Sequence, residues 1–581
     1  MLINSRIAPS RELHEAFAAL RPWLRRSLLF TLIAGLLILA PSVYMLEVYD
    51  RVVNSRNPQT LLMLTLAVVF AFVVMQVLEW AHDEEMHAAG LQLDRRLGAR
   101  VFAASFEANL RALPSSTTQP LADLRFLREF LTSPVLKAAL ESPVSLVFLV
   151  VIFAIHPLLG WAAGVGALVQ LAIALLNNRA THAQLSAAQR SAQAAQRYAD
   201  GALRNAQAVA AMGLLGDIRR RWATDQSEFL QLQAKASLGG AVFVAGAKLV
   251  QVAWASLLLG LACWLLLRDE LTGGAAMLIV ASILGGQMLR PLTVAVGHWR
   301  TALQAGDAWL RLAALLASVP PAAEQMALPP PRGQLQAENL VVTPPGAHQP
   351  VLRGVSFSLR PGEVLGVIGP SAAGKSCLAR ALVGLWPSTG GKARLDGVDL
   401  HAWNKAQLGP HIGYLPQEVE LSDGTIADNI ARFGPFDQAR LDSVAHTVGL
   451  HEFIRALPDG WGTEVGNEGA RLSGGQRQRI GLARALYAEP AFVVLDEPNA
   501  SLDDAGDAAL IQAIQDAKTR GATVVVVTHR VSLMPVVDKL LWLSEGAVQA
   551  FGPRDQVLAA TRRATRAARP MPTAAPTEPV S

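Results

Sequence analysis

The sequence predicts an α-helical membrane domain of six spans, followed by an α/β domain built around a phosphate-binding loop. Composition is the first observation behind this fold class: of the 581 residues, 51% are hydrophobic and only 17% are charged, whereas a soluble chain usually carries about a quarter charged residues. The second observation is Gly-x-x-x-x-Gly-Lys-Ser in the second half, placed between an apolar run of strand length and a helical pattern. Such a loop requires that context.

Residues 1–27 are predicted to form a cytoplasmic N-terminal segment. Arg21, Arg25 and Arg26 precede the first apolar run, and basic residues favour the cytoplasmic side of a membrane. That run has spanning length and lacks a small-residue cleavage site, so we expect no signal peptide. A folded domain needs about fifty residues. We therefore expect no peptidase-like domain before the first span and no cleavage of leader peptides.

Six apolar runs predict a transmembrane domain over residues 28–300. Two polar regions between the runs keep helical spacing, and the arginines of the first one place it on the inner side. His156-Pro157 divides the third run from the fourth, which predicts a tight external turn with His156 as a turn residue rather than a ligand. The six runs cover 28–46, 60–78, 143–155, 158–176, 250–267 and 275–296.

Two basic residues, Lys248 and Arg290, fall near the inner ends of the last two runs. Long basic side chains near a helix end commonly extend to the membrane surface, and this is our main interpretation of both. An alternative for Arg290, which precedes Pro291, is that it lines a cavity.

A Pro-rich stretch predicts a linker over 301–332, after which a soluble domain occupies 333–558. The last residues, 559–581, are expected to be a disordered tail whose arginines could touch anionic lipid. Cys263 and Cys377 lie far apart in the sequence, so a disulfide framework is not expected. The formal net charge of +5 is modest for this length and does not indicate binding to nucleic acid.

The phosphate-binding loop is the central functional motif of the soluble domain. Small residues allow backbone N–H groups to converge on phosphate oxygens, and the N-terminus of the following helix adds positive potential. Lys375 is predicted to reach the β- and γ-phosphates of ATP, and Ser376 to hold Mg²⁺. The predicted ATP-binding residues are Gly369, Pro370, Ser371, Ala372, Ala373, Gly374, Lys375, Ser376 and Cys377.

Two carboxylates end a second apolar strand, 492–496. Asp496 is placed to hold Mg²⁺ through water, and Glu497 to polarise the water that attacks the γ-phosphate. Two acids after an apolar strand are common by chance, but they are uncommon at this position downstream of a phosphate loop.

The segment Leu472-Ser473-Gly474-Gly475-Gln476 is the most discriminating motif. With it the chain resembles the ABC transporter ATPases, whose signature motif reads LSGGQ. Physically, a serine and two glycines open a helix and present a second set of N–H groups to an anion. The resemblance implies that this motif completes the ATP site of the opposite subunit, so that two chains enclose two ATP molecules.

Three further residues are assigned by the same resemblance. Gln417 corresponds to the glutamine that senses Mg²⁺, Asp503 lies at the dimer contact, and His529 corresponds to the switch histidine on the γ-phosphate. The resemblance thus implies a homodimeric half-transporter with ATP and Mg²⁺ as cofactors. The implied catalytic residues are Glu497, His529, Lys375 and Gln417, and the implied metal ligands are Ser376, Gln417 and Asp496.

Short segments of the first half, such as 48–53 and 211–215, are similar to the type I secretion ATPases of the alkaline protease exporter group. That similarity implies an exporter in a Gram-negative inner membrane, with its ATPase domain in the cytoplasm. Its cargo would be an unfolded polypeptide with a C-terminal secretion signal. The implied partners are a membrane fusion protein and an outer-membrane channel of the TolC type. Nucleic acid is not among them.

Three departures from the family pattern affect the predicted site. Pro344 stands near the position of the usual aromatic residue under adenine, so no stacking residue is assigned. Asn467, with Glu468 beside it, replaces the usual Glu before the signature, which puts the details of coupling in doubt. Cys377 replaces the usual Thr, and we expect little effect from it.

Three other functions remain open at this stage. An exporter of lipids or drug-like molecules would have the same machinery with a different cargo. A soluble ABC-type ATPase acting on ribosomes or DNA would lack the six spans. A catalytically dead membrane scaffold would not need Glu497, Lys375 and His529 together.

Overall fold

The computed structural model describes residues 11–112, 118–271, 276–321, 326–466 and 469–567. Its contacts divide the chain into two compact units. One consists of Met1–Asn109 with Ser115–Pro321, and the other of Leu110–Pro114 with Ala322–Ser581. We call the first the membrane unit and the second the ATPase unit, and each is described by itself.

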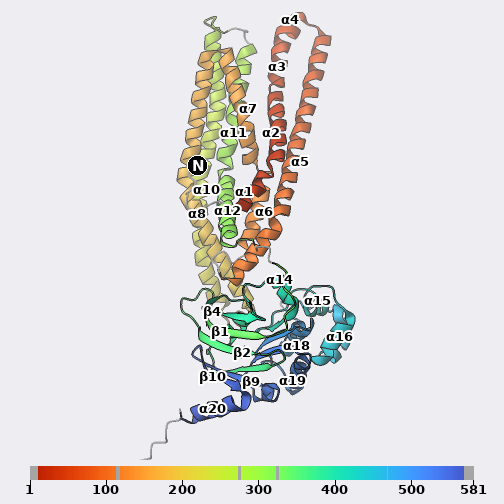
Figure 1. Ribbon diagram of the computed structural model, residues 1–581. Coiled ribbons are helices and arrows are strands. Elements are labelled where there is room, and N and C mark those ends of the chain that lie inside the picture. Colours follow the sequence, from red (N-terminus) through yellow and green to blue (C-terminus); the bar gives the residue numbers. More distant parts are fainter. Residues whose placement is uncertain (1–10, 113–117, 272–275, 322–325, 467–468, 568–581) are drawn as a thin grey trace, which may run out of the picture. The chain divides into compact units, whose positions relative to one another are not determined.

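Among its described residues, the membrane unit has six helical segments that are long and apolar enough to cross a membrane (Figure 1). The six predicted spans are therefore confirmed, and an entirely soluble ATPase is not supported. The helices of the unit are α1 (Arg11–Ala18), α2 (Arg21–Leu37), α3 (Ala40–Glu47), a π-helical turn (Val48–Val52), α4 (Val53–Ser55), α5 (Pro58–Leu110), α6 (Gln119–Phe130), α7 (Pro134–Ile155), α8 (Pro157–Arg204), α9 (Ala206–Ala211), α10 (Leu215–Leu266), α11 (Ala276–Gly297) and α12 (Trp299–Ser318).

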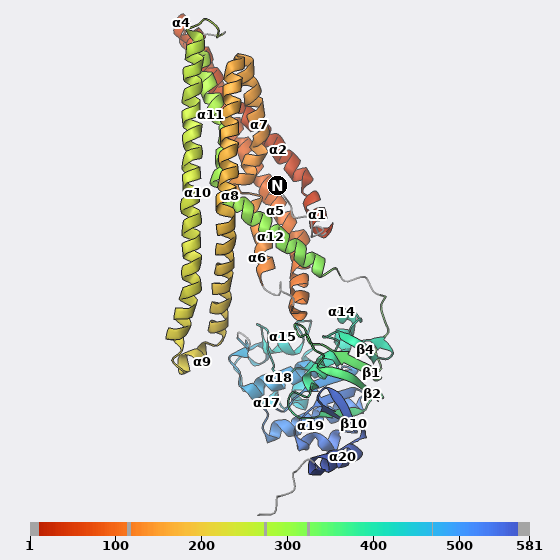
Figure 2. The same ribbon diagram turned by 90° about the vertical axis from the view of Figure 1, so that its left-hand side faces the viewer.

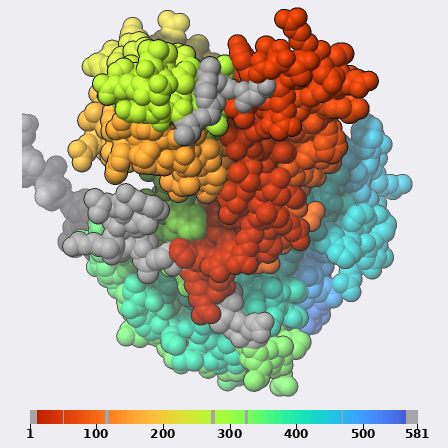
Figure 3. Space-filling model, turned by 90° about the horizontal axis from the view of Figure 1, so that it is seen from above, coloured from red at the N-terminus to blue at the C-terminus, as the bar shows by residue number. Residues whose placement is uncertain are grey.

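Three of these helices extend far beyond their apolar stretches. α5, α8 and α10 contain 53, 48 and 52 residues, which confirms that the polar regions after the second and fourth spans are helical. α8 and α10 run side by side and are joined by α9 at one end, as Figure 2 shows. Seen from above, the ends of α3 to α5 form one group, and the ends of α7, α8, α10 and α11 form another (Figure 3).

Small residues permit close packing between the membrane helices. A Cβ on Gly160 would lie 2.2 Å from the ring of Phe153, and one on Gly166 would lie 2.4 Å from the indole nitrogen of Trp254. The same indole donates a hydrogen bond to the carbonyl of Ala162 at 2.8 Å. Contacts of this kind stabilise helix association where no hydrophobic driving force acts between helices.

His156 forms the turn between α7 and α8, as predicted. Its backbone is extended and precedes Pro157, the first residue of α8. The Nδ1 atom of His156 accepts a hydrogen bond from the N–H of Leu158 at 3.2 Å. The side chain therefore caps a helix, and the turn-residue interpretation is confirmed.

The helix after the last span occupies the first part of the predicted 301–332 linker. Arg311 of α12 makes two hydrogen bonds to the buried carboxylate of Asp123 in α6, at 2.8 and 2.7 Å. The indole of Trp309 packs edge-on against Phe17 of α1. Residues up to Ser318 are thus a packed part of the membrane unit, and Pro320 and Pro321 follow the helix.

The ATPase unit contains two sheets. Four strands form one sheet in the order β2-β1-β4-β5, and six form the other in the order β10-β9-β3-β8-β7-β6. In the larger sheet, β9, β3, β8, β7 and β6 pair in parallel, and only β10 is antiparallel. The strands are β1 (Leu335–Val342), β2 (Leu352–Leu359), β3 (Val364–Ile368), β4 (Ser388–Leu395), β5 (Val398–Asp399), β6 (Ile412–Leu415), β7 (Phe492–Asp496), β8 (Thr523–Val527), β9 (Lys539–Ser544) and β10 (Ala547–Pro553).

Every residue of β7 and β8 is buried, as expected for central parallel strands with both faces covered. Parallel strands align their carboxyl ends, so the loops after β3, β6, β7 and β8 meet at one edge of the sheet. The helices of the unit are α13 (Lys375–Leu382), α14 (Lys405–Leu408), α15 (Ile426–Ile430), α16 (Gln438–Thr447), α17 (His451–Arg455), α18 (Gly474–Leu486), α19 (Asp504–Thr519) and α20 (Arg554–Ala567).

The prediction of disorder from residue 559 onward was wrong for its first part. α20 continues to Ala567 and buries Val557. Alanine and arginine both have high helix propensity, and this composition extends the helix although no apolar periodicity marks it. Residues 568–581 lie outside the described part of the chain.

Candidate nucleotide-binding and catalytic site

The phosphate loop connects β3 to α13, as predicted. Gly369 approaches the next strand so closely that a Cβ would lie 2.1 Å from the carbonyl oxygen of Leu543, and Gly374 has a φ of +98°. Both positions therefore require glycine. Ala372 also adopts a left-handed conformation, with a φ of +63°. The loop curls its backbone in front of the helix N-terminus, which suits it to bind an anion.

Lys375 is the first residue of α13 and is only 6% exposed. Its Nζ donates hydrogen bonds to the carbonyl oxygens of Gly369 at 3.0 Å and Pro370 at 2.9 Å. Burial lowers the pKa of the Lys375 ammonium, while the charges of Glu497 and Asp496 oppose that shift. The ammonium thus lies inside the curl of the loop, where a phosphate group would compensate the cost of burying its charge.

Asp496 ends β7 and is 1% exposed. Neither of its carboxylate oxygens has a hydrogen-bond partner among the described residues. Burial raises the pKa of the Asp496 carboxyl, and the neighbouring Ser376 hydroxyl opposes the rise. Burying an ionised carboxylate of this kind is costly unless a positive charge lies beside it.

The residues around Asp496 therefore fit a Mg²⁺ ion. Mg²⁺ in phosphoryl-transfer sites is held by one or two protein oxygens, with phosphate oxygens and waters completing its shell. Asp496 and the Ser376 hydroxyl supply such oxygens. In the described part of the chain no three His, Cys, Asp or Glu side chains cluster as a metal cage, and this type of site does not need one.

Glu497 is held by two neighbours at the carboxyl edge of the large sheet. Its Oε1 lies 3.3 Å from Nε2 of His529, and its Oε2 accepts a hydrogen bond from Nε2 of Gln417 at 3.0 Å. The three residues follow the adjacent strands β7, β8 and β6. The structure thus brings together three residues that the sequence places far apart.

The backbone of Glu497 is in a left-handed conformation, with a φ of +49°. Its N–H donates to the carbonyl oxygen of Val527 at 3.0 Å. A left-handed glutamate is uncommon and costs free energy, and such residues cluster at functional sites.

Gln478 is a residue of the candidate site that the sequence analysis missed. It lies in α18 and is 4% exposed, and its side-chain amide donates to the carbonyl oxygens of Glu497 at 3.3 Å and Pro498 at 3.1 Å. This contact connects the helix of the signature motif to the backbone of the loop after β7. A buried glutamine on an otherwise apolar helix face was the only available signal.

The signature motif opens α18, as predicted from its residue types. Ser473 caps the helix: its Oγ accepts from the N–H of Gln476 at 3.3 Å, and the Gln476 side chain accepts from the Ser473 N–H at 2.8 Å. Ser473 and Gly474 are exposed, whereas Leu472 is buried. A Cβ on Gly475 would lie 2.9 Å from the carbonyl oxygen of Ser501. The start of this helix is thus held against the loop after Glu497 and presents its polar end to solvent.

Asp503 caps α19 by accepting a hydrogen bond from the N–H of Gly506 at 2.9 Å. Arg479 of α18 also donates to it at 2.6 Å. The Gly506 N–H and the Arg479 charge lower the pKa of the Asp503 carboxyl. Within one chain, Asp503 therefore links the signature helix to α19, and its side chain is 69% exposed.

Three positions where the sequence departs from the family pattern can now be located in the structure or lie outside its described residues. Pro344 lies in the turn between β1 and β2, where its carbonyl accepts a hydrogen bond from Ala347. Cys377 carries a free thiol whose pKa is raised by burial. Asn467 and Glu468 lie outside the described residues.

Two family models match the chain. The model described as the ABC transporter transmembrane region matches residues 24–288, and the model described as the ABC transporter matches residues 352–500. The sequence is 38% identical over 530 residues to the type I secretion system ATP-binding protein PrsD of Rhizobium meliloti, covering 90% of each chain. It is 26% identical to the leukotoxin translocation ATP-binding protein LktB of Mannheimia haemolytica, covering 92% of this chain and 76% of LktB.

The fold is similar to that of a bacterial Atm1-family ABC exporter with ATP bound. The two align with a TM-score of 0.80 at 22% identity, covering 96% of this chain and 100% of the exporter chain.

Proposed function

Since the chain belongs to the ABC transporter family that includes the type I secretion ATP-binding proteins, we propose that it is an ATP-driven exporter of unfolded polypeptides. The observation that carries this proposal is the 38% identity to a type I secretion protein over both the membrane and the ATPase parts. The chain is an ATPase whose hydrolysis is coupled to transport. Export of lipids or drug-like molecules is the second candidate, and no observation on this chain favours it.

ATP hydrolysis needs a base beside the γ-phosphate, and we assign this role to Glu497. Gln417 and His529 contact opposite oxygens of its carboxylate, so the side chain cannot turn away from the site. The carboxylate would orient and polarise the attacking water. His529, which is half exposed, would also contact the γ-phosphate.

The phosphates would occupy the loop of Gly369 to Cys377. Lys375 would exchange its contacts with the loop carbonyls for contacts with the β- and γ-phosphates. Ser376 and Asp496 would hold Mg²⁺, with the side-chain oxygen of Gln417 as a further ligand. When bound, the ion neutralises negative charge that develops on the phosphates.

The site is incomplete without a second chain in this proposal. The exposed end of α18, from Leu472 to Gln476, would close the ATP site of the partner subunit, and Asp503 would lie at the contact between the two subunits. ATP binding would bring the two ATPase units together, and hydrolysis would release them. The protein would therefore work as a homodimer.

We place the protein in the inner membrane of a Gram-negative bacterium, with the segment 1–27 and the ATPase domain (333–558) in the cytoplasm. The polar helical regions, including Arg111–Leu124 and Ala211–Gly216, would carry the motion of the ATPase domains to the spans. A membrane fusion protein and a TolC-type outer-membrane channel would complete the export path. The cargo would carry a C-terminal secretion signal.

Deleting the gene and comparing the secreted proteins tests the proposal directly. We expect the loss of one or a few proteins from the medium, restored by the wild-type gene but not by a Glu497→Gln version. An unchanged set of secreted proteins together with altered membrane lipids or drug sensitivity would instead support the second candidate.

A further inference from the structure

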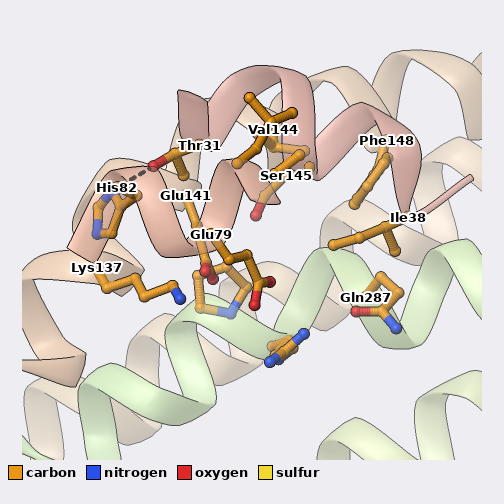
Figure 4. A pocket seen from close by; sticks show the side chains of 15 residues that line it. Thr31, Ile38, Glu79, His82, Lys137, Glu141, Val144, Ser145, Phe148 and Gln287 are labelled. Atoms are coloured by element: carbon orange, nitrogen blue, oxygen red, sulfur yellow. Dashed lines mark hydrogen bonds between the residues drawn. The ribbon is translucent and has the colours of Figure 1, made fainter. Parts of the chain in front are cut away.

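A small hollow in the membrane unit is lined by charged side chains that the ATPase mechanism does not use. It lies between α2, α5, α7 and α11 (Figure 4). Its charged lining residues are Glu79, Lys137, Glu141 and Arg290. The cavity-lining alternative for Arg290 is therefore confirmed.

Two of these charges lie at the ends of the apolar stretches of their helices. Glu79 directly follows the apolar run of α5, and Glu141 lies two residues before the apolar run of α7. Apolar side chains, among them Ile38, Val144 and Phe148, line another part of the hollow. Its other polar lining residues are Thr31, His82, Ser145 and Gln287. Figure 4 shows Glu79, Lys137 and Glu141 directed into the same space. The hollow thus has a charged part and an apolar part.

None of the four charged side chains forms a hydrogen bond or an ion pair with another residue in the part of the chain that the structure describes. Glu79, Lys137 and Glu141 are half-buried, and Arg290 is exposed. Ionisable residues within membrane helices are costly and are normally paired or functional. Arg290 and Lys137 lie near enough to Glu141 to attract it. Because neither makes a hydrogen bond or an ion pair with it, the charged groups can still contact a ligand from outside the chain.

The size and composition of the hollow restrict that ligand. Its volume is about 30 Å³. Since one water molecule needs about 10–15 Å³ of such volume, the hollow holds roughly two water molecules. A whole peptide or an acyl chain does not fit, but the charged end of one amino-acid side chain does. Lys137 and Arg290 would repel a free cation, and Glu79 and Glu141 would repel a free anion.

Prolines next to two of the charges add to the polar character of this region. Pro143 and Pro291 lie inside α7 and α11, and a proline has no N–H to give to the carbonyl four residues earlier. The carbonyl of Ala139 is served instead by the Ser142 hydroxyl at 2.7 Å. The carbonyl of Gln287 has no helical N–H donor, because Pro291 lacks the N–H that would normally bond to it. This carbonyl is therefore suited to accept a hydrogen bond from a peptide N–H.

We propose that this hollow is a contact site for the cargo polypeptide and receives the charged end of one side chain at a time. Glu79 and Glu141 contact a passing lysine or arginine, and Lys137 and Arg290 contact a passing aspartate or glutamate. The inference rests on the proposed export function, and it names a site for cargo within the membrane unit. A polypeptide supplies both charge signs and backbone N–H groups, which no single small ion does.

Charge-selective binding tests the proposal. The probes are fluorescent, unstructured Gly–Ser peptides that carry several Lys, several Glu or several Gln, measured by anisotropy with full-length protein in nanodiscs. Glu79→Gln/Glu141→Gln should weaken binding of the Lys peptide by about tenfold and leave the Glu peptide within about twofold. Lys137→Gln/Arg290→Gln should do the reverse. Glu228→Gln and Arg219→Gln, at exposed positions on α10, serve as matched controls.

A purely structural role would affect all peptides equally or lower basal ATP hydrolysis, and either result would overturn the inference. Unchanged peptide binding, with loss of phosphatidylethanolamine from the variants in native mass spectra, would overturn it in favour of a lipid headgroup. Failure of the export function is distinguishable: the wild-type protein would bind no charged peptide, and deletion of the gene would leave secretion normal.

Discussion

The substitution Glu497→Gln tests the role of this residue as the base with little change to the fold. Glutamine has the same shape, so its side-chain oxygen can still accept the hydrogen bond from Gln417 that Glu497 accepts at 3.0 Å. The contact to His529, 3.3 Å in the wild type, would lose its charge. Because the Glu497 side chain is 25% exposed and both contacts lie at the surface of the site, we expect the free energy of unfolding to change by less than about 1 kcal/mol.

The rate of ATP hydrolysis should change far more. A positioned general base contributes about 10²–10⁴-fold to a rate, and an amide cannot accept a proton from the attacking water. We therefore expect hydrolysis to fall by about that factor, while ATP binding persists because Lys375 and the loop are unchanged. The assay measures phosphate release and binding of a fluorescent ATP analogue by the same purified protein.

A matched control isolates the chemistry from the backbone. Glu545, in the exposed turn between β9 and β10, has almost the same left-handed conformation, with a φ of +47°. Glu545→Gln should therefore reproduce any effect of the substitution on a strained backbone and leave hydrolysis unchanged. Hydrolysis by Glu497→Gln at the wild-type rate would refute the assignment of Glu497 as the base.

Three further predictions concern the rest of the site. Lys375→Ala should lose ATP affinity and secretion together. Because burial disfavours the charged ammonium of Lys375 and lowers its pKa, the variant should keep its thermal stability in the absence of nucleotide. Normal secretion by this variant would contradict the proposed role of Lys375. Asp496→Asn should abolish Mg²⁺-dependent hydrolysis. Burial raises the pKa of the Asp496 carboxyl above its ordinary 3.8, so the folded state holds this proton more tightly than the unfolded state does. The nucleotide-free protein therefore loses stability as the pH rises from the ordinary to the raised pKa. Asp496→Asn should remove that loss, which thermal unfolding measured at several pH values would show. Ser473→Ala should lower the free energy of unfolding by about 1 kcal/mol through the lost helix cap, and it should reduce ATP hydrolysis if the signature motif closes the site of a partner subunit as proposed. Full activity would argue against that role.

The sequence allowed the fold and most of the site to be predicted, because the decisive residues lie at the ends of strands or the starts of helices. The order of apolar strand, loop and helix around Lys375 constrains the chain locally, and so does the helix start at Ser473. Six apolar runs likewise suffice to predict the spans, since length and hydropathy decide whether a helix crosses a membrane.

Contacts between distant segments were not predictable from the sequence. The bond from Gln417 to Glu497 joins residues 80 positions apart, and it depends on the order of strands in the sheet. Gln478 has no motif of its own, because its role comes from the carbonyls it meets in the folded chain. The four charges of the membrane hollow also come from three helices that lie far apart in the sequence, so only Arg290, beside a proline, gave a hint.

The length of α8 and α10 has a mechanical consequence. At about 1.5 Å per residue, the 52 residues of α10 form a rod of about 78 Å, and α8 lies beside it over most of that distance. A pair of stiff rods rotates as one body, so a tilt of only about 5° at one end displaces the other by about 7 Å. A small tilt of the helix pair that starts at the α9 end would therefore displace the opposite end of the pair by several ångströms.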